Sequence, residues 1–171
     1  MISDKSLTVC LTGHRPSKLP WRYDETKENC NRFKNDLRVV LESAITYGLK
    51  RFFTGMAEGF DMIATEILLE LKNIYKDIRI IAVIPCLGQE KKWTKSQQEK
   101  FNEILKNCDD TIIISKIYTK SCMKDRNQFM VNHSSVVIAC YNGLPGGTEN
   151  TIRFAKAKGS KIKIINPDNY K

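Results

Sequence analysis

The chain has 171 residues, 42% of them hydrophobic, and its 28 Lys and Arg against 19 Asp and Glu give a formal net charge of +9. This length fits one domain with a proper core, spanning 1–171, and the hydrophobic content excludes a disordered chain. The positive charge favours partners that carry phosphate, although the lysines are scattered and a solvated surface explains most of them. With no apolar run long enough to span a membrane and no signal peptide at Met1–Lys5, we expect a cytoplasmic protein.

The cysteines and histidines give no metal-binding pattern. None of the six cysteines forms a CxxC pair, and most lie in or beside apolar runs. His14 and His133 lack metal-ligand spacing to the cysteines. We therefore expect buried thiols in a reducing compartment, no metal site and no cofactor.

Short apolar runs alternate with amphipathic runs along the whole chain. The first strand is expected at 7–11, and the Pro-containing stretch 13–24 is expected to be a loop. Further strands are predicted at 52–54, 78–84, 111–114, 135–140 and 162–165, and helices at 26–47, 62–74, 95–107, 122–132 and 148–158. Pro85 is expected to end the third strand. Short, β-branched strands that are apolar on both faces predict an α/β fold, a Rossmann-like, doubly wound, mostly parallel sheet of about six strands with helices on both faces.

In such a sheet every loop that follows a strand lies along one edge, where ligands bind near the reversal of strand order. The candidate loops are Gly13–Leu19, Gly55–Asp61, Pro85–Trp93, Ser115–Arg126 and Asn142–Glu149. Distant in sequence, they are predicted to be neighbours in space.

The first loop offers Gly13, His14 and Arg15. The planar guanidinium of arginine suits phosphate because it gives paired hydrogen bonds and keeps its charge. The alternatives are a surface arginine beside a turn and a histidine with a structural hydrogen bond.

The second loop places Gly55 and Gly59 around Glu58, and Asp61 just inside the following helix. Asp61 is a candidate for holding a ribose hydroxyl, but a carboxylate near a helix N-terminus is also favourable without any ligand. Glu58 has no evident structural role in the turn, and exposure to solvent is its alternative.

Two further loops add candidates beside these. Trp93, which follows Gln89, is predicted either to stack on a base or to cap the sheet edge as an apolar residue. Arg126 and Asn127 lie on a predicted helix close to the ligand edge. A surface salt bridge is the alternative for Arg126.

The last loop, Asn142–Glu149, joins a buried strand to an amphipathic helix. Gly146 and Gly147 let the backbone approach a ligand, and Thr148 adds a hydroxyl and an N–H at the helix start. This combination suits phosphate.

Four motifs together resemble the SLOG superfamily, and most closely its YpsA-like branch, which is related to DprA and the Lonely Guy phosphoribohydrolases. Residues 9–16 (VCLTGHRP) match the branch's opening motif, with Gly13 and Arg15 at the Gly-x-Arg of DprA. Residues 55–64 (GMAEGFDMIA) match the DprA-type G-x-A-x-G-x-D-x-x-A. Residues 123–130 (MKDRNQFM) resemble M-x-x-R-K-x-x-M of the phosphoribohydrolases, and 145–148 (PGGT) their P-G-G-x-G-T.

The resemblance implies a Rossmann-like nucleotide-binding fold whose usual ligands are nucleoside monophosphates or derivatives of ADP-ribose and NAD. It is also compatible with a homodimer. In the phosphoribohydrolases, catalysis uses the Arg of M-x-x-R-K-x-x-M and a Glu shortly after P-G-G-x-G-T. Arg126 matches the first, whereas Glu149 directly follows Thr148 and so stands earlier than the family's Glu. Arg126, Glu149 and Glu58 are therefore the catalytic candidates.

Three functions follow from these residues. The first is binding of a nucleotide or nucleotide derivative, as a sensor or regulator. The second is an enzyme that hydrolyses the N-glycosidic bond of a nucleoside monophosphate. The third is DprA-like binding of single-stranded DNA. The scattered lysines make this function less favoured than the other two.

Overall fold

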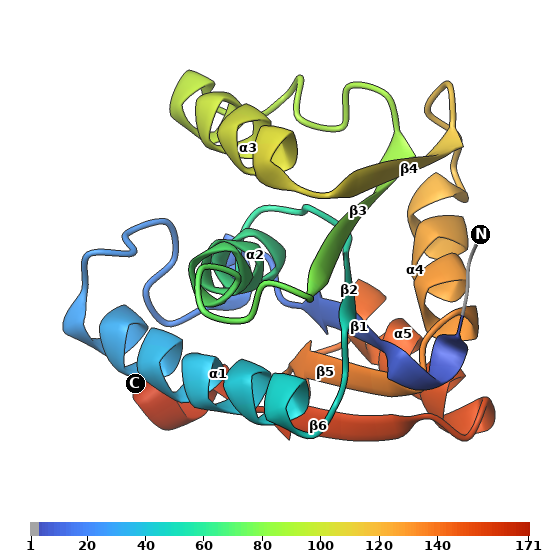
Figure 1. Ribbon diagram of the computed structural model, residues 1–171. Helices are drawn as coiled ribbons and strands as arrows, with labels where there is room; N and C mark the ends of the chain where they lie inside the picture. Colours follow the sequence, from blue (N-terminus) through green and yellow to red (C-terminus); the bar gives the residue numbers. More distant parts are fainter. Residues whose placement is uncertain (1–3) are drawn as a thin grey trace.

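The computed structural model describes residues 4–171, whose six strands form one parallel sheet (Figure 1). The strands are β1 (Thr8–Gly13), β2 (Arg51–Thr54), β3 (Arg79–Cys86), β4 (Asp110–Ser115), β5 (Val136–Cys140) and β6 (Lys161–Ile165). Their order is β4-β3-β2-β1-β5-β6, and all five pairings are parallel. The expected Rossmann-like fold is confirmed.

The five α-helices of residues 4–171 cover the two faces of this sheet (Figure 1). On one face lie α1 (Glu28–Thr46), α2 (Phe60–Leu71) and α3 (Lys95–Asn107), and on the other lie α4 (Cys122–Asn132) and α5 (Gly147–Ala157). The chain moves outward from β1 to β4 and then returns to β5 on the far side of β1. Because crossovers between parallel strands are right-handed, this reversal puts α4 and α5 on the opposite face. None of the helices in 4–171 is both long and apolar enough to cross a bilayer.

Separate apolar clusters fill the two faces of the sheet. On the α1–α2 face the fully buried Phe33, Phe52 and Phe60 belong to the larger cluster. On the other face Met130 of α4 and Ile152 of α5 pack against β-strand residues. Strands buried on both faces are what the uninterrupted apolar runs predicted.

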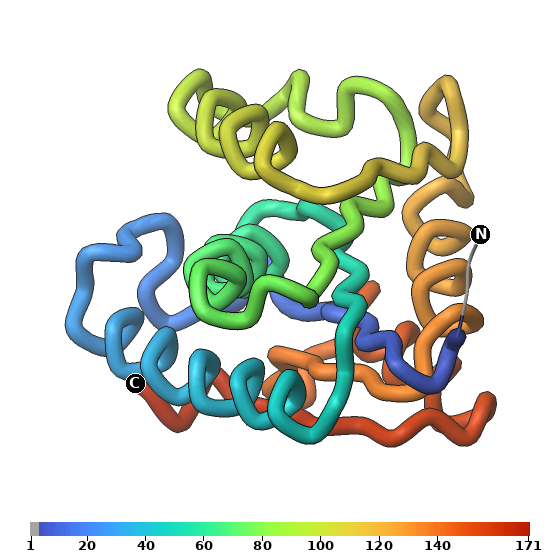
Figure 2. The backbone as a smooth tube through the Cα atoms, viewed as in Figure 1, coloured from blue at the N-terminus to red at the C-terminus, as the bar shows by residue number. Residues whose placement is uncertain are grey.

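Most boundaries differ from the sequence prediction by one to three residues, and two regions differ in kind. The prediction that Pro85 ends the third strand is wrong, because β3 continues to Cys86, which pairs with Ser115 of β4. Proline lacks an N–H but keeps an extended backbone, so it is tolerated near the end of a strand. The connection 14–27 includes a short 3₁₀ turn, Pro16–Lys18, and passes beside α2 before α1 begins (Figure 2). Trp21 in this connection is fully buried against Phe33.

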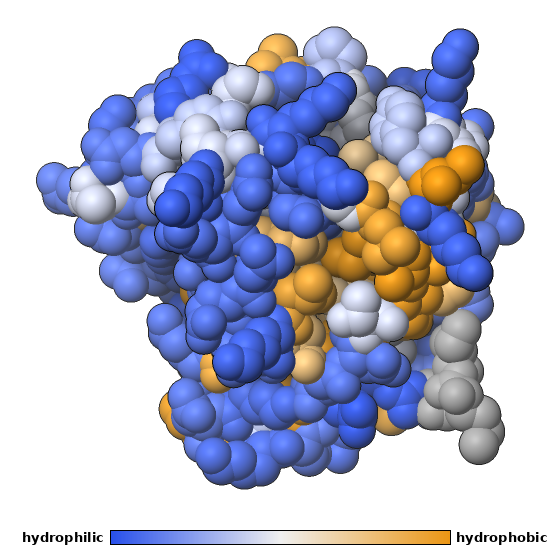
Figure 3. Space-filling model, turned by 90° about the horizontal axis from the view of Figure 1, so that it is seen from above, coloured by the Kyte–Doolittle hydropathy of each residue, from blue (hydrophilic) through white to orange (hydrophobic). Residues whose placement is uncertain are grey.

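The β4 side of the sheet carries exposed apolar side chains. Viewed from above, an apolar area interrupts a mostly hydrophilic surface (Figure 3). Ile113 of β4 and Ile117 just after it are 46% and 71% exposed. An edge strand of this kind also leaves backbone groups without a strand partner on one side.

A close contact joins the end of β1 to the start of α2. The N–H of Phe60 donates to the carbonyl of His14 at 3.2 Å. A Cβ added at Gly13 would lie 2.5 Å from the Phe60 ring, and one at Gly59 would lie 2.6 Å from the His14 carbonyl oxygen. Gly59 also has φ +89°, which disfavours any residue with a side chain. Both glycines are therefore needed to bring α2 against β1.

Gly13→Ala is expected to lower the free energy of unfolding by about 1–3 kcal/mol, because the new methyl group overpacks a buried contact. Urea denaturation measures this. Gly147→Ala is the matched control, because a Cβ there meets nothing within 4 Å. Equal stability of the two variants would contradict the contact.

Candidate functional site

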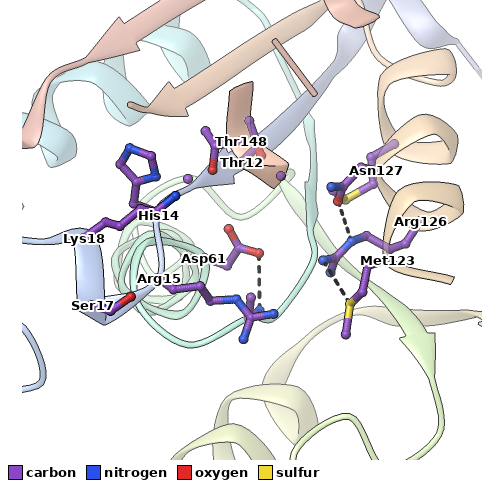
Figure 4. Close-up of a pocket in the computed structure, with 14 residues that line it drawn as sticks. Thr12, His14, Arg15, Ser17, Lys18, Asp61, Met123, Arg126, Asn127 and Thr148 are labelled. Atoms are coloured by element: carbon purple, nitrogen blue, oxygen red, sulfur yellow. Dashed lines mark hydrogen bonds between the residues drawn. The ribbon is translucent and has the colours of Figure 1, made fainter. Parts of the chain in front are cut away.

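A cavity of about 270 Å³ opens at the carboxyl edge of the sheet, beside the ends of β1 and the loop after β5 (Figure 4). Its lining residues are Thr12, Gly13, His14, Arg15, Ser17, Lys18, Ala57, Asp61, Met123, Arg126, Asn127, Met130, Gly147 and Thr148. The strand order reverses between β1 and β5, so the loops after these strands run to opposite faces and leave a crevice between them. The topology therefore places the cavity where open α/β sheets bind ligands.

Arg126 of α4 reaches the cavity as a buried cation, with 5% of its surface exposed. Its Nη1 donates to the carbonyl of Gly55 at 2.5 Å and its Nε to Oδ1 of Asn127 at 2.7 Å. A Cβ at Gly55 would lie 2.0 Å from Nη1, so only glycine leaves room for the guanidinium. Burial lowers the pKa of Arg126, and the nearby Asp61 carboxylate opposes that shift. Arg126 is therefore a buried, hydrogen-bonded residue and does not form the surface salt bridge that was its alternative.

Asp61 lies in the cavity with Arg15 and Arg126 as its charged neighbours (Figure 4). Its Oδ2 accepts from the N–H of Ala57 at 3.3 Å, and the side chain is buried near the start of α2. Burial raises the pKa of Asp61, while Arg126, the Ala57 N–H and Arg15 favour its charged form. The residue thus serves the helix N-terminus and at the same time faces the cavity.

Arg15 and Glu58 lie near one another on the two loops that meet at the α2 start. Arg15 is partly exposed and lines the cavity, whereas Glu58 does not line it and is 9% exposed. Burial raises the pKa of Glu58, and the positive charge of Arg15 opposes the shift. Glu58 is therefore a buried electrostatic neighbour of Arg15, which excludes the solvent-exposed alternative.

His14 connects the β1 loop with the loop after β5. Its Nε2 lies 2.6 Å from Oδ1 of Asn142, and Asn142 Nδ2 donates to Asp168 at 3.3 Å. The imidazole is 3% exposed, and this burial lowers the pKa of His14. His14 lines the cavity, but its Nε2 is engaged in holding Asn142.

The α5 N-terminus forms the wall opposite the β1 loop. Gly147 and Thr148 line the cavity in the first turn of the helix, and Thr148 is buried. Lys18 spans the two loops, since its Nζ donates to the carbonyl of Pro145 at 2.5 Å. Free N–H groups at a helix start, beside a lysine, favour an anion in this part of the cavity.

Eight of the ligand-binding residues predicted from the sequence line this one cavity. They are Gly13, His14, Arg15, Asp61, Arg126, Asn127, Gly147 and Thr148. The other selected binding residues lie outside its lining. Among them Gly55 and Gly59 make room for Arg126 and for the β1 loop, and Gly146 precedes α5 and approaches Lys18.

Gln89 and Trp93 lie on the loop after β3, away from the cavity lining. Gln89 Nε2 donates to the carbonyls of Gly55 and Met56 at 3.3 and 3.2 Å. The Trp93 ring packs edge-on against Phe101, with centroids 5.5 Å apart. Gln89 thus supports the loop that carries the Arg126 contact, and Trp93 takes the apolar capping position.

Glu149 does not line the cavity. It accepts from Arg153 Nη2 at 3.2 Å, one turn further along the surface of α5. Of the three catalytic candidates, only Arg126 lines the cavity, with Glu58 buried nearby.

Several lining residues were not selected from the sequence. They are Thr12, Ser17, Lys18, Ala57, Met123 and Met130. Thr12 directly precedes Gly13, and Ala57 lies between Gly55 and Gly59. Their place in the glycine turns is the sequence signal that could have identified them as lining residues. No local pattern distinguishes Lys18 from the other scattered lysines.

The pH dependence of stability tests the burial of His14. Because the folded pKa is lowered from 6.5, its stabilising effect is complete above that pH and declines as the pH falls through the folded value. The stability of wild type is therefore expected to fall more steeply below about pH 6.5 than that of His14→Gln. Urea titrations from pH 7.5 to 5 measure the difference, and parallel profiles would contradict it.

Known proteins similar to this chain agree with this fold. A family model described as the YspA SLOG family, YpsA, matches residues 9–169. The SPbeta prophage-derived protein YoqJ of Bacillus subtilis strain 168 is 29% identical over 152 residues, covering 80% of this chain and 89% of that protein.

Two solved structures of DNA processing protein A share the architecture at low identity. The Helicobacter pylori protein, described with a single-stranded DNA binding mode, has a TM-score of 0.63 and 19% identity, covering 98% of this chain and 72% of its own. The Streptococcus pneumoniae protein has a TM-score of 0.61 and 17% identity, covering 94% of this chain and 50% of its own. Because the family model spans nearly the whole chain, the protein belongs to the YpsA-like SLOG family.

Proposed function

We propose that the cavity binds a nucleotide or nucleotide derivative and that the protein acts as a sensor or regulator. The observation that carries the proposal is the meeting of Arg15 and Arg126, from distant parts of the chain, in one cavity beside the α5 N-terminus. Two guanidinium groups and the N–H groups at a helix start together match the oxygen atoms of a phosphate.

The charge of the lining supports an anionic ligand. Arg15, Lys18 and Arg126 contribute three positive groups, against the single carboxylate of Asp61. Buried charges cost free energy unless they are paired, and Asp61 shares its surroundings with both arginines. A phosphate supplies negative charge for the cations that the single carboxylate of Asp61 does not balance.

Asp61 gives the site a means to recognise the sugar. Its Oδ2 accepts one N–H from Ala57, and a carboxylate has further lone pairs to accept from a ribose hydroxyl. Thr148 adds a hydroxyl on the α5 side. We assign phosphate to the arginines and the helix N-terminus, and ribose to Asp61.

Binding, rather than hydrolysis, is the better-supported use of this cavity. Hydrolysis of an N-glycosidic bond requires a carboxylate close to the sugar that stabilises positive charge or activates water. Glu149 is directed to Arg153, and the charged form of Asp61 is favoured by the nearby Arg126 and Arg15.

Isothermal titration calorimetry against AMP, ADP-ribose and NAD tests the proposal. Arg15→Gln is expected to weaken binding about tenfold or more, because it removes a charge-assisted hydrogen bond to phosphate. Arg32→Gln on the exposed side of α1 is the control and keeps wild-type affinity. Absence of binding at millimolar concentrations of all three ligands would refute the proposal.

Chromatography of the same nucleotides after incubation separates binding from turnover. We expect each nucleotide to be recovered intact. Release of free base that is lost in Asp61→Asn but retained in Glu149→Ala would assign hydrolysis to this cavity instead.

Single-stranded DNA is the second candidate, because the fold likeness includes a DNA processing protein described as binding it and because the net charge is +9. Such binding would weaken steeply as salt rises. A gel shift with a short oligonucleotide measures it, and no shift at about 50 mM salt removes this candidate.

A further inference from the structure

A second pocket, of about 430 Å³, opens at the amino edge of the sheet, where β1, β5 and β6 begin. It is formed by the chain before β1, the turn after α1 and the connections that lead from α4 into β5 and from α5 into β6. No residue within 4–171 lines both this pocket and the cavity at the carboxyl edge. The two sites are therefore separate.

Two buried hydroxyl groups of this amino-edge pocket have no hydrogen-bond partner among residues 4–171. Ser134 has 0% of its surface exposed, and its Oγ is unpaired. The Oγ of Ser160 is likewise buried and unpaired. Both serines line the pocket. Because an unpaired buried hydroxyl costs free energy, both groups require a partner, and the pocket is where one can reach them.

Three lysines surround the same pocket. Lys5, Lys158 and Lys161 line it and are exposed, and within 4–171 none of them has an acidic group at ion-pair distance. No described residue of the lining is acidic. Asp4, the neighbouring acid in the chain, accepts from the N–H of Ser6 at 3.0 Å. The pocket thus carries positive charge that its own lining does not balance.

Two of these lysines rest on aromatic rings. The Nζ of Lys158 lies 5.3 Å from the centroid of the Phe154 ring, and the Nζ of Lys161 lies 6.0 Å from that of Tyr47. Tyr47 also lines the pocket. A cation–π contact orients an ammonium group without neutralising it, so both lysines keep their charge for a ligand.

The helix ends at this edge use several of their carbonyl groups within the main chain. The C-terminus of a helix carries partial negative charge, which by itself attracts cations. At the end of α5, however, the carbonyl of Ala155 accepts from the N–H of Ser160, and at the end of α4 the carbonyl of Val131 accepts from the N–H of Ser134. These bonds reduce the pull of the helix ends on the lysines.

We infer that this pocket binds the phosphate group of a small soluble ester between the Ser134 and Ser160 hydroxyls and the lysine ammonium groups. The hydroxyls donate to phosphate oxygens, and the ammonium groups balance the charge. Pockets for small ligands span about 300–1,000 Å³, so this volume leaves room for a short organic part beside Tyr47. The inference does not depend on what the cavity at the carboxyl edge binds.

NMR titration of ¹⁵N-labelled protein with inorganic phosphate and with glycerol phosphate tests the inference residue by residue. We expect the amide signals of Ser134 and Ser160 to shift along a saturating curve. The signals of Arg15 and Thr148 report on phosphate in the cavity instead. The two sites are therefore measured independently in one experiment.

Ser134→Ala and Lys158→Gln are each expected to weaken binding at the amino-edge pocket about fivefold, because they remove a donor and a charge. Without phosphate, Ser134→Ala is expected to melt at the same temperature as wild type or higher, because it removes an unpaired hydroxyl. Lys163→Gln is the matched charge control, since Lys163 is exposed on β6 and does not line the pocket.

The failures of this inference and of the proposed function are distinguishable. Shifts that do not saturate at millimolar phosphate, or equal affinity in wild type and Lys158→Gln, overturn the pocket as a phosphate site. A lower melting temperature with unchanged affinity in Ser134→Ala shows that water satisfies the hydroxyl and also overturns it. So does a DNA oligonucleotide that shifts the same signals at lower concentration than glycerol phosphate, because the lysines then belong to a nucleic-acid surface. Silence of the cavity signals alone, with nucleotides as with phosphate, refutes only the proposed function.

Discussion

The site depends on the contact between the N-terminus of α2 and the carboxyl end of β1. It brings Phe60 onto Gly13 and bonds its N–H to the carbonyl of His14. Asp61, the next residue, is thereby fixed beside Arg15. The backbone contact between β1 and α2 therefore places both Asp61 and Arg15 at the crevice.

A second close approach completes the arrangement from the other face of the sheet. Arg126 comes from α4, which packs on the face opposite α2, and its guanidinium rests on the Gly55 carbonyl. The sheet edge is thus the one place where residues from both helical layers meet. Placing two arginines and one carboxylate there concentrates charge at low exposure, which is costly without a partner and strengthens recognition of an anion.

The cavity is continuous with a groove of about 650 Å³ between α4 and α5, because Met123, Asn127 and Gly147 line both. Residues of α4 line both sites, Arg126 and Met130 the cavity and Lys124 the groove, and Lys120 just before the helix also lines the groove. A helix shared in this way connects the buried Arg126 to an open, basic surface.

Local patterns in the sequence predict the alternation of strands and helices, the parallel sheet and the edge where the cavity opens, because apolar periodicity and glycine turns are local properties. They also point to Gly13, Arg15, Asp61 and Arg126, which line one cavity in the folded chain. The packing of the folded chain fixes the pairing of Glu149 along its own helix and the contact of Trp93 with Phe101. It likewise revealed Lys18, whose role depends on Pro145, 127 positions away in the chain. Side-chain direction and contacts of such long range are set by packing between elements, which no local pattern encodes.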